Sequence, residues 1–125
     1  MADRNKIWEY ANELGVLLSQ SPEVAIYKQA EQVLNENMQA QSLIRQFREL
    51  QEQLAQLEER GAERKYTKPL RDQTMKILKE IDSIPEVRAF KEAQEQVNEL
   101  LSSVSNLLAS VITQKVEDLQ NSCES

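Results

Sequence analysis

A chain of 125 residues suits one compact domain, and its formal net charge of −6 argues against general affinity for nucleic-acid phosphates. The sequence has no histidine and 1 cysteine, which excludes most hydrolase mechanisms, most zinc sites and any internal disulfide framework. With only 2 glycines and 3 prolines it holds few helix breakers and no Gly-rich phosphate loop, so we predict an all-α fold.

The first two helices are predicted from apolar spacing and from a capping sequence. Apolar residues recur at steps of three and four near residues 4–19, and they are Ile7, Trp8, Ala11, Leu14 and Leu18. Residues 21–23 then supply a serine cap, a proline at the first helical position and an acid in the first turn. They predict a second helix near 22–35, which ends where the asparagines of 35–37 permit a turn or a new cap.

The third and fourth helices are predicted to pair as a hairpin. A heptad seam predicts a helix near 38–60 that ends at Gly61, and the seam consists of Leu43, Phe47, Leu50, Leu54 and Leu57. Thr67 is a candidate cap for a helix near 68–82, whose predicted buried face is Leu70, Thr74, Ile77, Leu78 and Ile81. An extended coiled coil with another chain would also use the seam, but we favour a hairpin arm that packs on itself.

The fifth helix, near residues 85–118, is the longest and has the widest apolar face. Because proline pushes the preceding residue out of helical geometry, Pro85 marks its start. Its face is wider than one neighbour would cover, which indicates a central helix, a subunit interface or both. We predict a homodimer or larger homo-oligomer, and the interface candidates are Leu101, Val104, Leu108 and Ile112. We therefore expect about five helices in an antiparallel hairpin or bundle, with 1–120 as a single helical domain and 121–125 as a flexible polar tail.

Two segments, 22–36 and 85–99, resemble each other at a constant offset. Each opens with Pro-Glu-Val, places an aromatic residue and a lysine one turn later, and ends in Asn-Glu. An internal duplication explains this, and so do two unrelated amphipathic helices that share a proline start and an apolar spacing. In both cases the two helices should open alike and bury an aromatic side chain one turn inside.

These features together resemble the YlbF/YmcA family of helical proteins from Gram-positive bacteria. The resemblance lies in the order and spacing of two stretches, SPEVAIYKQAEQVLNENMQAQSLIRQFRELQEQ and IPEVRAFKEAQEQVNELLSSVSNLLASVI. The sequence NEN between the second and third helices, and a cysteine in the polar end NSCES, resemble the YmcA branch. The resemblance covers most of the chain.

The resemblance implies a function that the residue pattern alone does not show. Members assemble with YlbF-like and YaaT-like partners, in a complex associated with ribonuclease Y-dependent messenger RNA processing and with competence, sporulation and biofilm formation. They are not known as enzymes. We therefore expect a non-enzymatic, self-associating regulatory adaptor that acts on ribonuclease Y indirectly.

Cys123 is the candidate metal ligand. The resemblance implies an iron–sulfur cluster in the assembled complex, and a four-iron cluster usually has four protein thiolates. One chain offers one, so partner chains would have to supply the others, and we expect no cofactor in the isolated protein. The alternative is an incidental free thiol near a frayed terminus.

Two further features have both a binding interpretation and a structural one. A basic patch surrounds the bend between the third and fourth helices, where it could meet an acidic partner or RNA or could be a solvated hairpin tip, which we favour: Arg60, Arg64, Lys65, Lys68 and Arg71. Trp8 could anchor a partner, because tryptophan is enriched at binding hot spots, or could attach the first helix to the core, which we favour.

The sequence also bears on the location of the protein and on an alternative function. No apolar run approaches the roughly 20 residues that cross a bilayer, and the first ten residues lack the apolar stretch of a signal peptide. We expect a cytoplasmic protein without membrane contact or direct binding to nucleic acid. The alternative function is that of a chaperone-like or structural helical protein that holds apolar client segments.

Overall fold

The computed structural model describes residues 2–124, and within this range the fold is entirely helical. The helices are α1 (Ala2–Ser19), α2 (Pro22–Glu36), α3 (Met38–Glu59), α4 (Arg64–Asp82) and α5 (Pro85–Glu124). The predicted all-α fold with five helices and a long C-terminal helix is confirmed. That residues 1–120 form a single domain stays a prediction.

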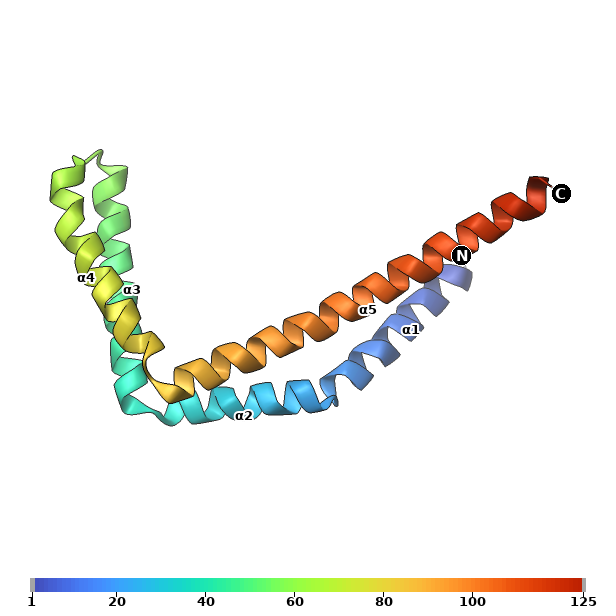
Figure 1. Cartoon of the computed structure of the whole chain (residues 1–125), viewed down its shortest axis with the longest axis horizontal. Helices are drawn as coiled ribbons and strands as arrows, with labels where there is room; N and C mark the ends of the chain where they lie inside the picture. The colour runs from blue at the N-terminus through green and yellow to red at the C-terminus, as the bar shows by residue number, and fades with distance from the viewer. Residues whose placement is uncertain (1, 125) are drawn as a thin grey trace.

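The helices form an angular molecule with two arms. Figure 1 shows α3 and α4 lying side by side as a hairpin, while α5 leaves the corner in another direction. Helix α2 runs antiparallel to the first part of α5, and α1 continues beyond α2 on the same side of the molecule. We call α3 with α4 the closed arm, and α1 with residues 101–124 of α5 the open arm.

The helix boundaries follow local signals in the sequence. Val24 donates its backbone N–H to the Ser21 side chain at 3.3 Å, and Ala40 donates its backbone N–H to Asn37 Oδ1 at 2.9 Å. Ser21 and Asn37 are therefore the N-caps of α2 and α3, as predicted. Gly61 ends α3 with a φ of 72°, a backbone conformation that costs glycine little because it has no Cβ.

The turn after α3 is a Schellman motif. The Ala62 N–H bonds to the Leu57 carbonyl at 3.1 Å, and the Gly61 N–H bonds to the Glu58 carbonyl at 3.0 Å. These bonds satisfy two carbonyls that the end of the helix leaves without intrahelical donors. The predicted end of α3 at Gly61 and the reversal into α4 are thus confirmed.

The predicted cap at Thr67 is wrong. Helix α4 begins at Arg64, one turn earlier than expected, with Glu63 at the N-cap position. The Thr67 hydroxyl instead donates to the Arg64 carbonyl at 3.1 Å, and the side chain is only 2% exposed. Threonine can bond backward to a carbonyl within a helix as well as forward at a cap, so the residue type alone did not decide between the two.

The predicted end of α5 near residue 118 is also wrong. The helix continues to Glu124, so residues 121–124 are helical where we expected a polar tail. The physical reason is that the sequence contains no glycine or proline after Pro85, and intrahelical hydrogen bonds continue through polar residues that have adequate helix propensity. Ser125 lies outside the described residues.

The buried core lies at the corner where α2, α3, α4 and the start of α5 meet. Its buried members are Leu34, Ala40, Leu50, Ile77, Ile81, Ile84 and Val87, and partly buried Leu43, Ile44, Phe47, Leu70 and Phe90 pack against them. Each buried aliphatic side chain contributes roughly 1.5–3 kcal/mol by leaving water. The hairpin interpretation of the α3 seam is confirmed, because seam residues Leu43, Phe47 and Leu50 belong to this core together with Ile77 and Ile81 of α4.

Candidate protein-binding surfaces

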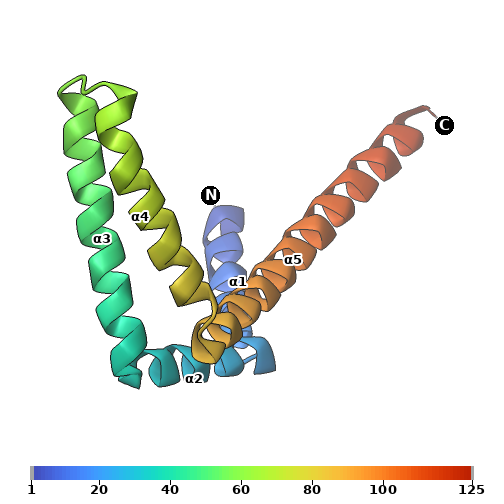
Figure 2. The same cartoon turned by 60° about the vertical axis from the view of Figure 1, so that its left-hand side comes forward.

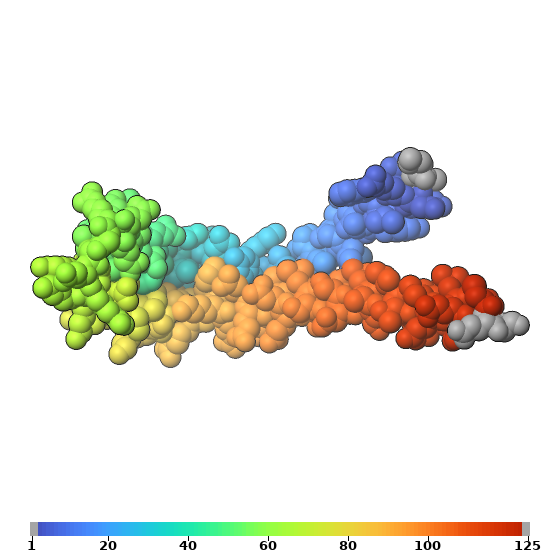
Figure 3. Space-filling view, turned by 90° about the horizontal axis from the view of Figure 1, so that it is seen from above, coloured from blue at the N-terminus to red at the C-terminus, as the bar shows by residue number. Residues whose placement is uncertain are grey.

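The apolar face of α1 is open to solvent. Trp8 is 71% exposed and Ile7 is 67% exposed, while Leu14 and Leu18 are half-buried toward the junction with α2. The interpretation that Trp8 attaches α1 to the core is therefore wrong. The space-filling view from above shows why, since α1 stands apart from α5 over its N-terminal half (Figure 3).

The outer part of α5 exposes a second apolar surface. Of the predicted interface residues, Leu101, Leu108 and Ile112 are 46%, 51% and 64% exposed, and Val104 is half-buried. More exposed apolar residues extend this surface toward the end of the helix: Leu107, Val111, Val116 and Leu119. Contiguous apolar surface of this kind marks sites where proteins bind other proteins.

The two apolar surfaces lie on different helices, and both belong to the open arm. Figures 1 and 2 show α1 and the outer part of α5 leaving the region of α2 separately, without a third helix between them. The exposed apolar side chains of the open arm thus lie on two separate helices.

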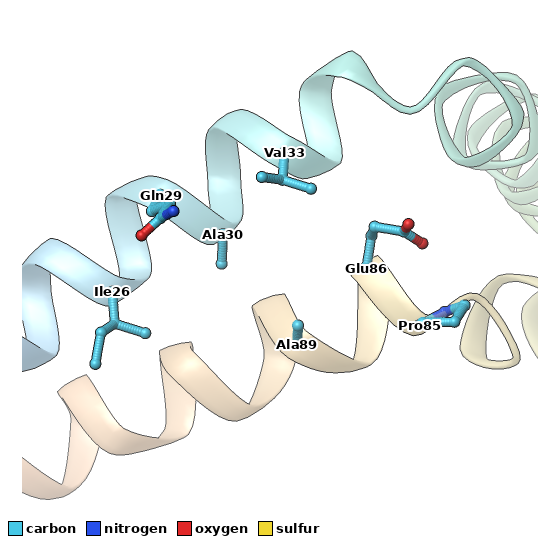
Figure 4. Close-up of a pocket in the computed structure, with 7 residues that line it drawn as sticks. All are labelled: Ile26, Gln29, Ala30, Val33, Pro85, Glu86 and Ala89. Carbon is cyan, nitrogen blue, oxygen red and sulfur yellow. The ribbon is translucent and has the colours of Figure 1, made fainter.

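A groove between α2 and α5 was not predicted from the sequence. It has a volume of about 380 Å³ and is lined by Ile26, Gln29, Ala30, Val33, Pro85, Glu86 and Ala89. Figure 4 shows these side chains between the two helices, where the small Ala30 and Ala89 leave space. The signal that could have revealed it is a second apolar stripe on α2, because Ile26 and Val33 lie two turns apart and both remain about half exposed.

The basic patch lies on the exposed side of α4. A hollow of about 540 Å³ is lined by Arg64, Lys65, Lys68, Arg71 and Asp72, so the structure brings together four of the five predicted residues; Arg60 is not among them. Arg71 Nη2 lies 2.5 Å from Glu58 Oε1, and Lys65 Nζ lies 3.5 Å from Glu63 Oε2. Carboxylates therefore neutralise part of this patch, as expected of a solvated hairpin tip.

Cys123 is a free, exposed thiol near the end of α5. It borders a shallow hollow that is otherwise lined by Val116, Leu119 and Gln120. Among the side chains of residues 3–123, those of His, Cys, Asp and Glu form no group of three or more that could hold a metal ion. The chain by itself therefore does not fit an iron–sulfur cluster, because one thiolate cannot complete the ligand set.

None of the helices in the described part of the chain is both long and apolar enough to cross a membrane. Helix α5 is long enough, but charged and polar residues interrupt its apolar positions.

Known proteins are similar to this chain in sequence or in fold. YmcA of Bacillus subtilis (strain 168) is 26% identical over 113 residues, which cover 90% of this chain and 78% of YmcA. A UPF0342 protein of Desulfitobacterium hafniense (strain Y51) is 25% identical over 107 residues, which cover 86% of this chain and 80% of that protein. A chain in the crystal structure of Bacillus subtilis RicA in complex with RicF has the same fold, with a TM-score of 0.82, 22% identity, and coverage of 89% of this chain and 96% of that one.

The chain can be assigned to a family because the sequence pattern of that family matches most of its length. The sequence pattern described as "Control of competence regulator ComK, YlbF/YmcA" matches residues 7–113, which include parts of all five helices. The resemblance drawn from the order of motifs is thereby confirmed, and this chain belongs to the YlbF/YmcA family.

Proposed function

We propose that this protein is a non-enzymatic regulatory adaptor that binds other proteins through its open arm. The observation that carries the proposal is the uneven distribution of apolar surface. Trp8 and Ile7 on α1 and the outer apolar residues of α5 are exposed, whereas the seam of the closed arm is packed against its own chain. A few residues supply most of the binding energy in a protein interface, and tryptophan is enriched among them.

The proposed partners are YlbF-like and YaaT-like proteins, together with further copies of this chain. The structural neighbour supports a protein partner, since it is a chain of the crystal structure of RicA in complex with RicF. Through these partners the protein would modulate ribonuclease Y-dependent messenger RNA processing in the cytoplasm, and so affect competence, sporulation and biofilm formation. The absence of histidine and of a Gly-rich phosphate loop in the sequence supports a role without catalysis.

Purification of the tagged protein from its native host tests the adaptor function. We expect a small set of partners in fixed ratios to the tagged chain. Trp8→Glu should remove partners that bind through the open arm, whereas Met75→Glu, on an exposed position of α4, should keep them. A broad set of unfolded or secreted clients would instead favour the chaperone-like alternative, for which the apolar α2–α5 groove is the candidate site.

A second experiment tests the link to RNA processing. A strain that lacks the protein should accumulate unprocessed transcripts that ribonuclease Y normally cuts, and the wild-type gene should restore their processing. The Trp8→Glu gene should fail to restore it, although the variant accumulates to a normal level. Normal processing in the strain that lacks the protein would contradict this part of the proposal.

We also propose that Cys123 contributes a thiolate to an iron–sulfur cluster only when partner chains are present. Its exposure at the end of α5 leaves the thiol accessible to another chain. The isolated protein should be colourless, and the complex assembled without oxygen should contain iron and sulfide. Cys123→Ser should reduce both while the circular dichroism spectrum stays helical, and unchanged iron and sulfide would show that the thiol is incidental.

A further inference from the structure

The hollow on the exposed side of α4 holds more positive charge than the carboxylates around it neutralise. We call it the basic hollow, and its lining residues are Arg64, Lys65, Lys68, Arg71 and Asp72. Lys65 and Arg71 each have a carboxylate partner in the chain. Among residues 3–123, no salt bridge involves Arg64 or Lys68. The basic hollow therefore keeps two unpaired cations in a chain whose formal net charge is −6.

The start of α4 adds to this positive potential. Its first turn contains no acidic residue, and the N-cap residue Glu63 makes no side-chain hydrogen bond to the helix. Helix α2, in contrast, has Glu23 in its first turn and a side-chain cap from Ser21. Because the N-terminal end of a helix is itself positive, Arg64 and Lys65 lie where a cation is unfavourable. An anionic group bound beside them would relieve this repulsion.

The cations of the basic hollow follow one face of α4. Arg64, Lys68 and Arg71 are separated by steps of four and three, so they lie on successive turns. They span about 10 Å along the helix axis at 1.5 Å per residue. A helix that lies along α4 would present carboxylates at the same intervals if its acidic residues recur at steps of three and four. The spacing thus matches the acidic face of a second helix.

Two features of the basic hollow favour an acidic protein segment over a nucleic acid. Asp72 is the lining residue farthest along α4, and its carboxylate would repel a phosphate backbone, which is negative along its whole length. Among the described residues, no aromatic side chain lines the hollow, whereas proteins that bind single-stranded nucleic acids stack the bases on aromatic rings. A protein segment can avoid the repulsion, because a lysine or arginine beyond its acidic residues would pair with Asp72.

The basic hollow lies apart from the apolar surfaces of the open arm. Figures 1 and 2 show the turn between α3 and α4 at the far end of the closed arm, while α1 and the outer part of α5 extend from the other side of the corner. A segment bound along the first turns of α4 would leave Trp8 and the outer part of α5 accessible. Two different proteins could therefore bind the chain at the same time.

We propose that the basic hollow binds an acidic helical segment of a partner protein, whose carboxylates contact Arg64, Lys68 and Arg71 and whose neighbouring basic residue contacts Asp72. The inference rests on the proposed function, because it gives the adaptor a second binding surface for a partner of stated charge. Arg71 can keep its ion pair with Glu58 and still bind a partner carboxylate, because a guanidinium group has five N–H donors.

A designed peptide tests the site on the full-length chain. The probe is a fluorescently labelled helical peptide whose glutamates recur at steps of three and four, made in two versions with a lysine one turn before or one turn after them. The control peptide has the same composition, but its glutamates are spread around the helix. We expect the better version to bind about 10-fold more tightly than the control, because only its glutamates meet the cations together. Equal affinities would overturn the proposal, and so would a lack of binding at millimolar peptide in low salt.

A charge-reversing substitution locates the contact on α4. Lys68→Glu should weaken the binding of the designed peptide by about 10-fold or more, because it replaces an attraction with a repulsion. Lys28→Glu is the matched control, since it makes the same change in net charge at an exposed lysine of α2, and it should weaken binding by less than about 2-fold. Circular dichroism checks that both variants stay helical. Equal weakening would mean that only the overall charge matters and would overturn the proposal.

The role of Asp72 and the choice of ligand are tested separately. Asp72→Asn should remove the preference for the designed peptide over the same peptide with alanine in place of its lysine. A single-stranded RNA of the same charge should bind the wild-type chain about 10-fold more weakly than the peptide does at equal salt concentration. An RNA that binds more tightly than the peptide, and loses affinity with Lys68→Glu, would make the ligand a nucleic acid and overturn the proposal.

Failure of this inference and failure of the adaptor function are distinguishable. If purification from the host recovers defined partners but the designed peptide binds no better than its control, the adaptor function holds and the acidic-segment site is wrong. If the peptide binds as expected but purification yields no defined partners, the basic hollow is a site for acidic segments and the adaptor function is wrong.

Discussion

The closed arm and the open arm are built from similar amphipathic helices, yet only the closed arm has its apolar face covered within the chain. On α4, Ile77 and Ile81 are buried against α3, while Ile7 on the apolar face of α1 is mostly exposed. The difference arises from the turn at Asn37 and the Schellman motif at Gly61, which return α3 and α4 to each other. An amphipathic pattern thus predicts that a helix face will be covered but does not predict which chain covers it.

The largest effect expected from a substitution is on the closed arm. Ile77→Ala should lower the free energy of unfolding by about 3 kcal/mol, because it leaves a cavity among buried neighbours in α3 and α4. Met75→Ala on the same helix should change it by less than about 0.5 kcal/mol, since that side chain is 54% exposed. Chemical denaturation followed by circular dichroism measures both. Equal losses of unfolding free energy in the two variants would show that packing against the α3 seam does not stabilise α4.

Substitutions of the two glycines should change the free energy of unfolding by an intermediate amount. Gly61→Ala should cost about 1 kcal/mol, because alanine is strained at a φ of 72°. Gly15→Ala lies within α1 and meets no heavy atom within 4 Å, so its better helix propensity should stabilise α1 by up to about 1 kcal/mol. Thermal unfolding with hydrogen exchange of α1 amides measures the two effects. A loss of stability in both variants would contradict the distinction between a required turn and a free helix.

The smallest effect is expected at the tip of the closed arm. Arg71→Ala removes the ion pair with Glu58 that joins α3 to α4, but both side chains are about half exposed. Exposed ion pairs contribute about 0–1 kcal/mol, so the loss should lie in the lower half of that range and shrink further in 1 M salt. Urea denaturation at two salt concentrations checks this. A loss above 2 kcal/mol that salt does not reduce would mean that this ion pair contributes much more to the stability of the closed arm than an exposed pair should.

The helix boundaries that depend on nearby residues could be predicted from the sequence. Ser21, Asn37 and Gly61 act on hydrogen bonds within a few residues of themselves, so the starts of α2 and α3 and the end of α3 were predictable. Thr67 was placed wrongly because a hydroxyl can bond forward at a cap or backward within a helix.

The candidate surfaces were harder to predict, because exposure depends on which helices meet in space. Trp8 lies on an apolar face that looks the same in sequence whether or not a neighbour covers it, and it proved to be 71% exposed. The α2–α5 groove was missed because it depends on Ala30 and Ala89 lying opposite each other across two helices. The contributions of Leu101, Leu108 and Ile112 to an interface stay predictions, although their exposure agrees with that role.

The unbroken course of α5 has a consequence for how the molecule could transmit a signal. Its 40 residues correspond to about 60 Å at 1.5 Å per residue, and Cys123 lies close to the far end. A chemical change at that thiol would therefore occur more than 50 Å from the buried corner where Val87 packs, by the same helical rise. If a partner binds at the end of α5 as proposed, oxidation or ligation of this thiol would therefore act on that partner and not directly on the buried corner.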